Sequence, residues 1–347
     1  MGEWNAARNM GFIALTFFVV YISAARGLPI GVLLRNTLRA AALYSLFMWV
    51  FRHAWYVNAS EYFVDSGKIF STFPNVYGIL SHPNYTALMF GSALVLEFAL
   101  WARYSSWRLS ALFSLISFVI LLTTQGRNAI GAAVMGVISV LLYRHGRTGW
   151  VSLIVALAFL ASWIPFALMI PVYMFGGSPA YGWLSAFTNR GSLWAAILEI
   201  LPEGILFGKG QAAIFEAHRY VSDSDVSDVT HAHNQVLDLL LVGGLIAGFL
   251  YLSLYSVIVS RIASKHAPAD GVGLVVVLTF TTITESPLTP YVTQIGVILF
   301  IAAIAILFSS NEINSRRTRP NLARPTANDG GPLFRRANHR NTAAKLP

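Results

Sequence analysis

The sequence predicts an all-α fold, a polytopic bundle of membrane-spanning helices, from three observations. Hydrophobic residues make up 56% of the 347 residues and charged residues only 11%, whereas soluble domains carry about 25% charged residues. Long apolar runs recur along most of the chain. Basic residues gather in the short segments between these runs. Together these features indicate an integral membrane protein.

Apolar runs define the expected spans. A helical span needs roughly 20 mostly apolar residues to cross a hydrocarbon core of about 30 Å. Backbone polar groups in lipid must bond within their own segment, so runs of this length are expected to be helical. On this criterion we expect about nine spans, near residues 10–25, 37–52, 84–102, 109–124, 128–143, 150–171, 234–259, 271–286 and 291–308.

The distribution of basic residues predicts the orientation, because cytoplasmic loops are enriched in Arg and Lys. If the C-terminus is cytoplasmic, 17 of the 24 basic residues fall inside and seven outside. Four separate loops agree on this arrangement; they contain Arg26, Arg35 and Arg39, then Arg103 and Arg108, then Arg144 and Arg147, then Arg261 and Lys265. The N-terminus is then outside, which a further span upstream of Met1 would explain.

The chain divides into an expected membrane domain over 1–308 and a basic, disordered cytoplasmic tail over 309–347. The tail contains eight basic residues with little apolar content, which suits a position beside an anionic leaflet. The net charge of +9 is therefore a topology signal and does not indicate nucleic-acid binding. The absence of cysteine excludes disulfides, thiolate metal sites and cysteine nucleophiles.

Two outer loops are long, one over about 53–83 and the other over about 172–233. The second loop contains apolar residues at helical spacing, preceded by Ser192 as a candidate N-cap and followed by Pro202. One interpretation is an amphipathic helix lying in the membrane interface. The alternative is a short helix packed on the loop's own core. The apolar positions are Leu193, Trp194, Ile197, Leu198 and Leu201.

Two arginines on the outer side are candidate anion ligands. Arg127 lies at the boundary between two spans, where a guanidinium can hold two phosphate oxygens in a bidentate fork. The alternative is an arginine that snorkels to lipid headgroups. Arg190 precedes the loop helix, whose N-terminus offers free N–H groups and a positive dipole end. The alternative for Arg190 is a surface residue in a polar loop.

Histidines stand at the mouths of two spans. His231, His233 and Asn234 lead into the seventh span, and a histidine there can act as a general base near neutral pH. The two histidines could also bind a metal, but they lack an evident third ligand, so we predict no metal. His82 stands at the mouth of the third span, where a helix-start turn is the alternative interpretation of its neighbours.

Two carboxylates lie at or near membrane depth, where ionisable groups are costly and suggest function. Glu285 is expected at the outer end of the eighth span, as the partner of an arginine or as a proton-handling group. Glu97 lies within the third span, and the sequence assigns it no role.

Three motifs in order resemble those of the bacterial O-antigen ligase and polysaccharide polymerase superfamily. The first is the block from Thr124 to Ala129, which contains Gln125 and Arg127. The second is Arg190 with Trp194 and Glu199, followed by Gly208-Lys209-Gly210. The third is His233-Asn234, followed by Gly244. The resemblance covers residues from about 82 to about 290.

The resemblance implies an inverting, metal-independent and cofactor-independent glycosyltransferase of the integral-membrane GT-C type in the bacterial inner membrane. Such enzymes pass a glycan from an undecaprenyl-diphosphate donor to a hydroxyl of a lipid, glycan or protein acceptor on the extracytoplasmic side. Carried over by position, Arg127 and Arg190 would bind the diphosphate, and His233 would orient or deprotonate the acceptor hydroxyl. The expected substrate-binding residues are Asn234, His231, His82, Glu285 and Gln125.

A membrane transporter or flippase for a lipid-linked or anionic solute is the alternative function. Transporters often contain paired, Gly/Pro-interrupted spans in corresponding halves, and the sequence shows no such pair. A non-catalytic scaffold would leave the outer charged groups without a common target.

Overall fold

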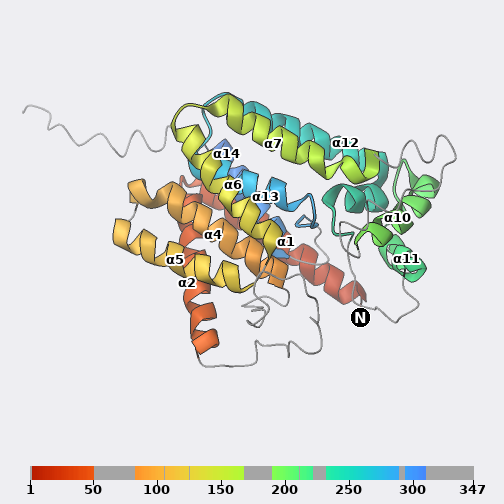
Figure 1. The fold of residues 1–347 in the computed structure, drawn as a ribbon, viewed down its shortest axis with the longest axis horizontal. Helices are drawn as coiled ribbons and strands as arrows, with labels where there is room; N and C mark the ends of the chain where they lie inside the picture. The colour runs from red at the N-terminus through yellow and green to blue at the C-terminus, as the bar shows by residue number, and fades with distance from the viewer. Residues whose placement is uncertain are drawn as a thin grey trace, which may run out of the picture. The chain divides into compact units, whose positions relative to one another are not determined.

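The protein is described by a computed structural model over residues 2–50, 83–104, 106–124, 126–167, 190–210, 212–221, 232–288 and 294–309. Within these residues every regular element is a helix, as the all-α prediction requires (Figure 1). Each of the nine predicted segments overlaps one long helix of this part. These helices are α1 (Gly2–Ala25), α2 (Ile30–Val50), α4 (Pro83–Tyr104), α5 (Trp107–Thr123), α6 (Arg127–Arg144), α7 (Thr148–Ser162), α12 (Gln235–Ala263), α13 (Ala269–Thr281) and α14 (Gln294–Phe308).

Among the described helices, α12 is long and apolar enough to cross a membrane. Five shorter apolar helical stretches accompany it: Ala14–Ser23, Trp107–Thr123, Thr148–Ser162, Ala269–Thr281 and Ile295–Phe308. The helices therefore lie where the sequence predicts them, and the number that cross the bilayer stays a prediction.

Helix α13 forms the centre of the packing. It contacts α6 most extensively and also packs against α14, α4 and α7. Its residues from Val272 to Leu278 are all buried, and no polar side chain interrupts them. On α6 the small residue Gly136 meets this helix: a Cβ on it would lie 2.8 Å from Val277 Cγ2 and 3.3 Å from the Gly273 carbonyl, so the two helices approach closely. A helix that is apolar on all sides requires this central position.

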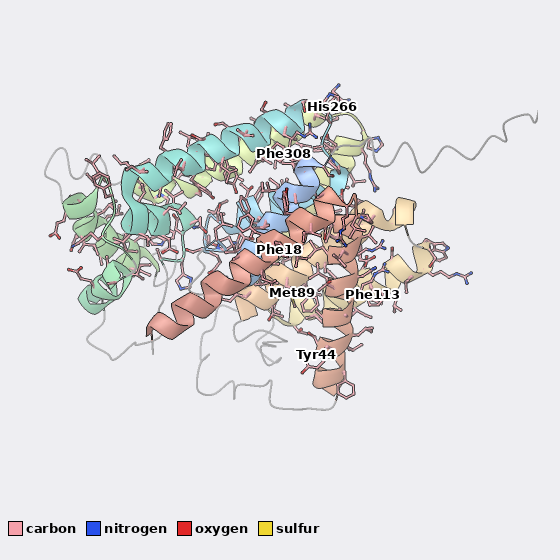
Figure 2. The ribbon with its side chains drawn as sticks, turned by 180° about the vertical axis from the view of Figure 1, so that it is seen from behind. Phe18, Tyr44, Met89, Phe113, His266 and Phe308 are labelled. Atoms are coloured by element: carbon pink, nitrogen blue, oxygen red, sulfur yellow. The ribbon has the colours of Figure 1, made fainter. Side chains whose placement is uncertain are left out.

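The outer helices expose large apolar side chains (Figure 2). Phe18 on α1 is 60% exposed, Tyr44 on α2 is 46% exposed and Phe308 on α14 is 42% exposed. Leucines on α5, α7 and α12 are exposed in the same way. Soluble monomers rarely leave so much contiguous apolar surface in water. This surface is suited to lipid.

Helix α2 begins at Ile30, seven residues before the predicted span. The prediction started late because two arginines in the first half of the helix interrupt the apolar run. Arg35 is nevertheless buried, and Arg39 forms a two-point ion pair with Glu97 of α4. The second bond, from the Arg39 guanidinium to Glu97 Oε2, measures 2.6 Å. This pairing gives Glu97 a structural partner that the sequence alone did not supply.

One predicted span is interrupted and another ends earlier than expected. In the segment predicted over 150–171, helix α7 ends at Ser162, whose hydroxyl donates to the carbonyl of Phe159. Residues 164–167 are helical again after Trp163, and 168–171 lie outside the described residues. The segment predicted over 271–286 ends as α13 at Thr281. There the Thr282 hydroxyl donates to the Thr279 carbonyl at 2.6 Å and occupies an acceptor of the last turn. Glu285 therefore lies in a turn after α13 and not on the helix.

The outer-loop helix is α10 (Arg190–Ile200), followed by the short 3₁₀ helix η2 (Leu201–Gly204) and by α11 (Ala212–Val221). It begins at Arg190, so Ser192 lies inside its first turn and is not the N-cap. Every residue from Leu193 to Leu198 is buried, and α10 packs against α11 and α12. The interfacial amphipathic helix is therefore corrected to a helix packed within the protein.

Candidate active site

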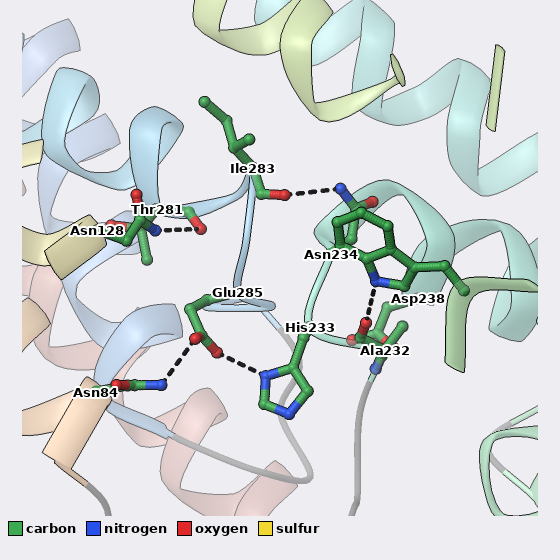
Figure 3. A network of polar contacts seen from close by, with 10 residues as sticks. Asn84, Asn128, Ala232, His233, Asn234, Asp238, Thr281, Ile283 and Glu285 are labelled. Atoms are coloured by element: carbon green, nitrogen blue, oxygen red, sulfur yellow. Dashed lines mark hydrogen bonds and ion pairs between the residues drawn. The ribbon is translucent and has the colours of Figure 1, made fainter. Parts of the chain in front are cut away.

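The last residue of α13 and the turn that follows it, together residues 281–285, contact the ends of several other helices (Figure 3). The carbonyl of Thr281 accepts a hydrogen bond of 3.4 Å from Asn128 Nδ2 at the start of α6. The next carbonyl, that of Thr282, accepts 3.2 Å from the backbone N–H of Gln235 at the start of α12. The beginnings of α6 and α12 are thus held against the same turn.

Asn234 fixes the start of α12 and is fully buried. Its Oδ1 accepts from the backbone N–H of Leu237 at 3.0 Å, which satisfies one of the free donors of the first turn. Its Nδ2 donates to the carbonyls of Ser162 and Ile283, both at 3.0 Å. The side chain expected to bind substrate therefore anchors the helix end beside His233.

The backbone of His233 has a φ of 52°, in the left-handed region, which costs a non-glycine residue roughly 1–2 kcal/mol. The preceding residue, Ala232, is held at both backbone groups. Its N–H donates to Asp238 Oδ1 at 2.7 Å, and its carbonyl accepts from Trp194 Nε1 at 2.8 Å. These buried bonds, together with the Asn234 cap, keep His233 in this conformation.

The His233 imidazole pairs with Glu285. Nδ1 of His233 lies 3.0 Å from Glu285 Oε2, and Glu285 Oε1 accepts from Asn84 Nδ2 at 2.7 Å (Figure 3). The His233 side chain is 19% exposed and that of Glu285 only 7%. The imidazole is therefore the more accessible member of the pair.

This pairing selects the tautomer of His233. A carboxylate only accepts hydrogen bonds, so the proton of a neutral imidazole lies on Nδ1. The opposite nitrogen, Nε2, then carries the lone pair that can take a proton from a hydroxyl. Glu285 also stabilises the imidazolium formed after that transfer, as the carboxylate of a catalytic triad does. The dyad can therefore act as an oriented general base.

Both predicted arginines lie on helices attached to this site. Arg127 is the first residue of α6, exposed and adjacent to Asn128. Arg190 is the first residue of α10, one helical turn before Trp194, which bonds the residue preceding His233. The side chain of Arg190 lies outside the described part of the structure. The starts of α6 and α10 are thus connected to the segment that carries His233, through Asn128 and Trp194 respectively.

Comparison with known proteins matches residues 112–252 to the family described as O-antigen ligase. The predicted resemblance is thereby confirmed. No curated protein and no solved structure matches the chain. The family match supports an O-antigen ligase or polymerase type of function in polysaccharide biosynthesis.

The O-antigen ligase match includes Arg127, Arg190 and His233 but ends before Glu285, and Asn84 precedes it. The partners of the histidine therefore come from the structure alone. Sequence reasoning placed Glu285 and the turn before α4 on the outer side, but it did not pair them. Asp238 was missed, although an acidic residue in the first turn of a helix is a recognisable signal.

Three residues predicted for the O-antigen ligase site, His82, Gln125 and His231, lie outside the described residues. Their predicted roles therefore stay predictions. Within the described part of the chain, no group of three or more His, Asp or Glu residues is arranged to hold a metal ion.

Proposed function

We propose that the protein transfers a glycan from an undecaprenyl-diphosphate donor to an acceptor hydroxyl at the extracytoplasmic face of the bacterial inner membrane, as a ligase or polymerase. The observation that carries this proposal is the His233–Glu285 dyad, with Nδ1 and Oε2 at 3.0 Å, on the scaffold that also holds the starts of α6 and α10. The family match supports the same class of reaction.

In the proposed reaction His233 Nε2 accepts the proton of the acceptor hydroxyl as its oxygen attacks the anomeric carbon of the donor sugar. A new glycosidic C–O bond forms, and the bond from that carbon to the diphosphate oxygen breaks. The single displacement inverts the anomeric configuration. The proton stays on His233, and the negative charge leaves on the undecaprenyl diphosphate.

Arg127 and Arg190 are proposed to hold the diphosphate and to stabilise its developing charge. Guanidinium groups can supply there the electrostatic stabilisation that a divalent cation gives in other transferases. We therefore propose a reaction without a metal. Glycan transfer that persists in EDTA is the expected result, and its loss would contradict this part of the proposal.

The test is reconstitution of the purified protein in vesicles with an undecaprenyl-diphosphate glycan and candidate acceptors. We expect His233→Ala to lower glycan transfer about 10²–10⁴-fold, with losses also in Arg127→Ala and Arg190→Ala. The matched controls are His266→Ala and Arg147→Ala, which change exposed residues at loops outside the site. Full activity in His233→Ala would refute the proposed role.

The product distinguishes the two branches and the alternative function. A ladder of glycan chains indicates a polymerase, and a single transfer to lipid or protein indicates a ligase. A transporter or flippase would move the donor across the vesicle membrane and form no new glycosidic bond. Absence of any glycosidic product, together with movement of the donor, would favour that alternative.

A further inference from the structure

Helix α12 is broken at Gly244, where φ is 64° and ψ is −160°. The break releases backbone groups that would otherwise bond along the helix, and at membrane depth such groups need partners from the protein. The loop over 205–210, before α11, provides them. The Leu241 carbonyl accepts from the N–H of Lys209 at 2.7 Å, and the Leu245 N–H donates to the Ile205 carbonyl at 2.8 Å.

The loop and the break fit together through two glycines. Gly208 has a φ of 77°, and a Cβ on it would lie 2.3 Å from the backbone of Val242. A Cβ on Gly244 would lie 2.3 Å from the backbone of Leu206. The two backbones therefore touch directly, and the tip of the loop is fixed at the level of the break.

The tip of this loop exposes two large apolar side chains. Leu206 is 57% exposed and Phe207 is 75% exposed. The backbone carbonyl of Leu206 accepts from the N–H of Ile246, which is 49% exposed. One turn further along α12, Phe249 is 68% exposed. This backbone bond brings the loop tip, with its exposed apolar side chains, next to the exposed apolar residues of α12.

The opposite end of the loop is charged. The ammonium of Lys209 bonds Glu203 and lies 3.5 Å from Glu216 on α11. The bond to Glu203 raises the pKa of Lys209, so the ammonium form is retained. Glu203 itself is 69% exposed. A loop with a charged base and an apolar tip is amphipathic along its length, as are segments at a membrane interface.

The length of α12 gives the depth of the break. Gly244–Ala263 contains 20 residues, which rise about 30 Å, the thickness of a hydrocarbon core. This half is therefore long enough to span the bilayer alone, with Arg261 in its last turn. Gly244 then lies at the outer boundary of the hydrocarbon region, and so does the loop tip bonded to it.

We infer that the tip of this loop, residues 205–207, inserts into the outer leaflet, where Leu206 and Phe207 contact lipid acyl chains. This inference rests on the membrane placement in the proposed function. It assigns the membrane contact of the outer loop to this tip and not to α10. The tip tethers the break in α12, and through the first half of that helix it tethers the segment that carries His233.

The chain has no cysteine, so a single cysteine can carry a nitroxide label without competition. We would label Phe207→Cys, Phe249→Cys as the lipid-facing reference and Glu203→Cys as the aqueous reference. The labelled proteins are placed in vesicles of phosphatidylethanolamine and phosphatidylglycerol. Collision rates of each nitroxide with oxygen and with a water-soluble nickel chelate report its depth.

The expected result is that Phe207→Cys matches Phe249→Cys, with oxygen collisions dominating, while nickel dominates at Glu203→Cys. If nickel dominates at Phe207→Cys while Phe249→Cys stays oxygen-rich, the loop insertion is wrong and the membrane placement of α12 stands. If nickel dominates at all three positions, the loop insertion and the membrane placement of α12 are both wrong. Each substituted side chain is largely exposed, so folding is expected to be retained.

Discussion

Glu285 accepts a hydrogen bond at each carboxylate oxygen, from His233 Nδ1 at 3.0 Å and from Asn84 Nδ2 at 2.7 Å. A glutamine at this position can accept at only one oxygen, so its NH₂ would face one of the two donors. A mismatch of this kind leaves a donor unsatisfied in a nearly closed site. The dyad therefore depends on the charge state of residue 285 and not only on its shape.

We predict that Glu285→Gln lowers glycan transfer by about 10²-fold or more, because the tautomer of His233 is no longer fixed. The double variant Asn84→Asp with Glu285→Gln should recover much of this loss. The new amide at position 285 can donate to the new carboxylate at position 84 while its carbonyl accepts from His233. Transfer rates in vesicles measure both. Equal activity of Glu285→Gln and wild type, or no recovery in the double variant, would contradict the pairing.

The Arg39–Glu97 pair gives a second prediction at this scale. Their side chains are 12% and 2% exposed, so removing one partner leaves a poorly solvated charge. We predict that Glu97→Leu lowers the free energy of unfolding by about 3–5 kcal/mol, whereas Arg39→Met with Glu97→Leu stays closer to wild type. Thermal unfolding in detergent compares the variants. Equal loss in the single and double variants would show that the pair does not matter.

At the scale of elements, the sequence predicted the positions of the helices well, but it predicted their boundaries and the contacts between their ends poorly. Apolar runs predicted nine segments because hydrophobicity is a local property. The arginines of α2 and the threonines after α13 shifted the boundaries, since burial of Arg35 and hydroxyl bonds of Thr282 depend on tertiary partners. The sequence singled out His233, Arg127 and Glu285 as candidates by residue type and position. Their pairing, across 52 residues for His233 and Glu285, was not readable from the chain.

The break in α12 is the clearest element that the sequence did not reveal. Gly244 was recognised only as part of a motif, and Gly208 as part of another. The contact between the loop and α12 explains why glycine stands at both positions. Each has a positive φ, and each lies directly against the backbone of the other segment, Gly208 against α12 and Gly244 against the loop. Neither motif alone indicates that backbone groups of the 205–210 loop bond the groups released by the break in α12.

We predict that Gly244→Ala and Gly208→Ala each lower stability by more than the roughly 1–2 kcal/mol that a left-handed backbone alone costs. The added Cβ would overlap backbone atoms at 2.3 Å, which only a movement of the loop can relieve. The matched control is Gly131→Ala in α6, where a Cβ meets nothing within 4 Å; a gain of about 0.5–1 kcal/mol is expected there. Unfolding temperature and glycan transfer are the measurements. Unchanged transfer in both glycine variants would show that the break does not position His233.

For the whole molecule, the helix packing determines which helix ends form the site, and the charge distribution predicts the side of the membrane on which they lie. Packing brings the starts of α4, α6 and α12 together with the ends of α7 and α13. The charge distribution predicts that these ends face outward, because the loops at the opposite ends hold the arginines. The site and the topology are thus linked: if the site is outside, the 145–147 and 264–268 loops are inside.

We predict that a membrane-impermeant maleimide labels Glu199→Cys in intact cells but labels Arg147→Cys and Ser264→Cys only after permeabilisation. All three side chains are exposed, so protection would report the side of the membrane and not burial. The cysteine-free parent provides the blank. Labelling of Arg147→Cys in intact cells would show that the topology is the inverse of the predicted one. The donor would then have to be supplied from the cytoplasm. Because the helix ends at the site are fixed against one another, a single inverted loop is enough to decide the side on which His233 works.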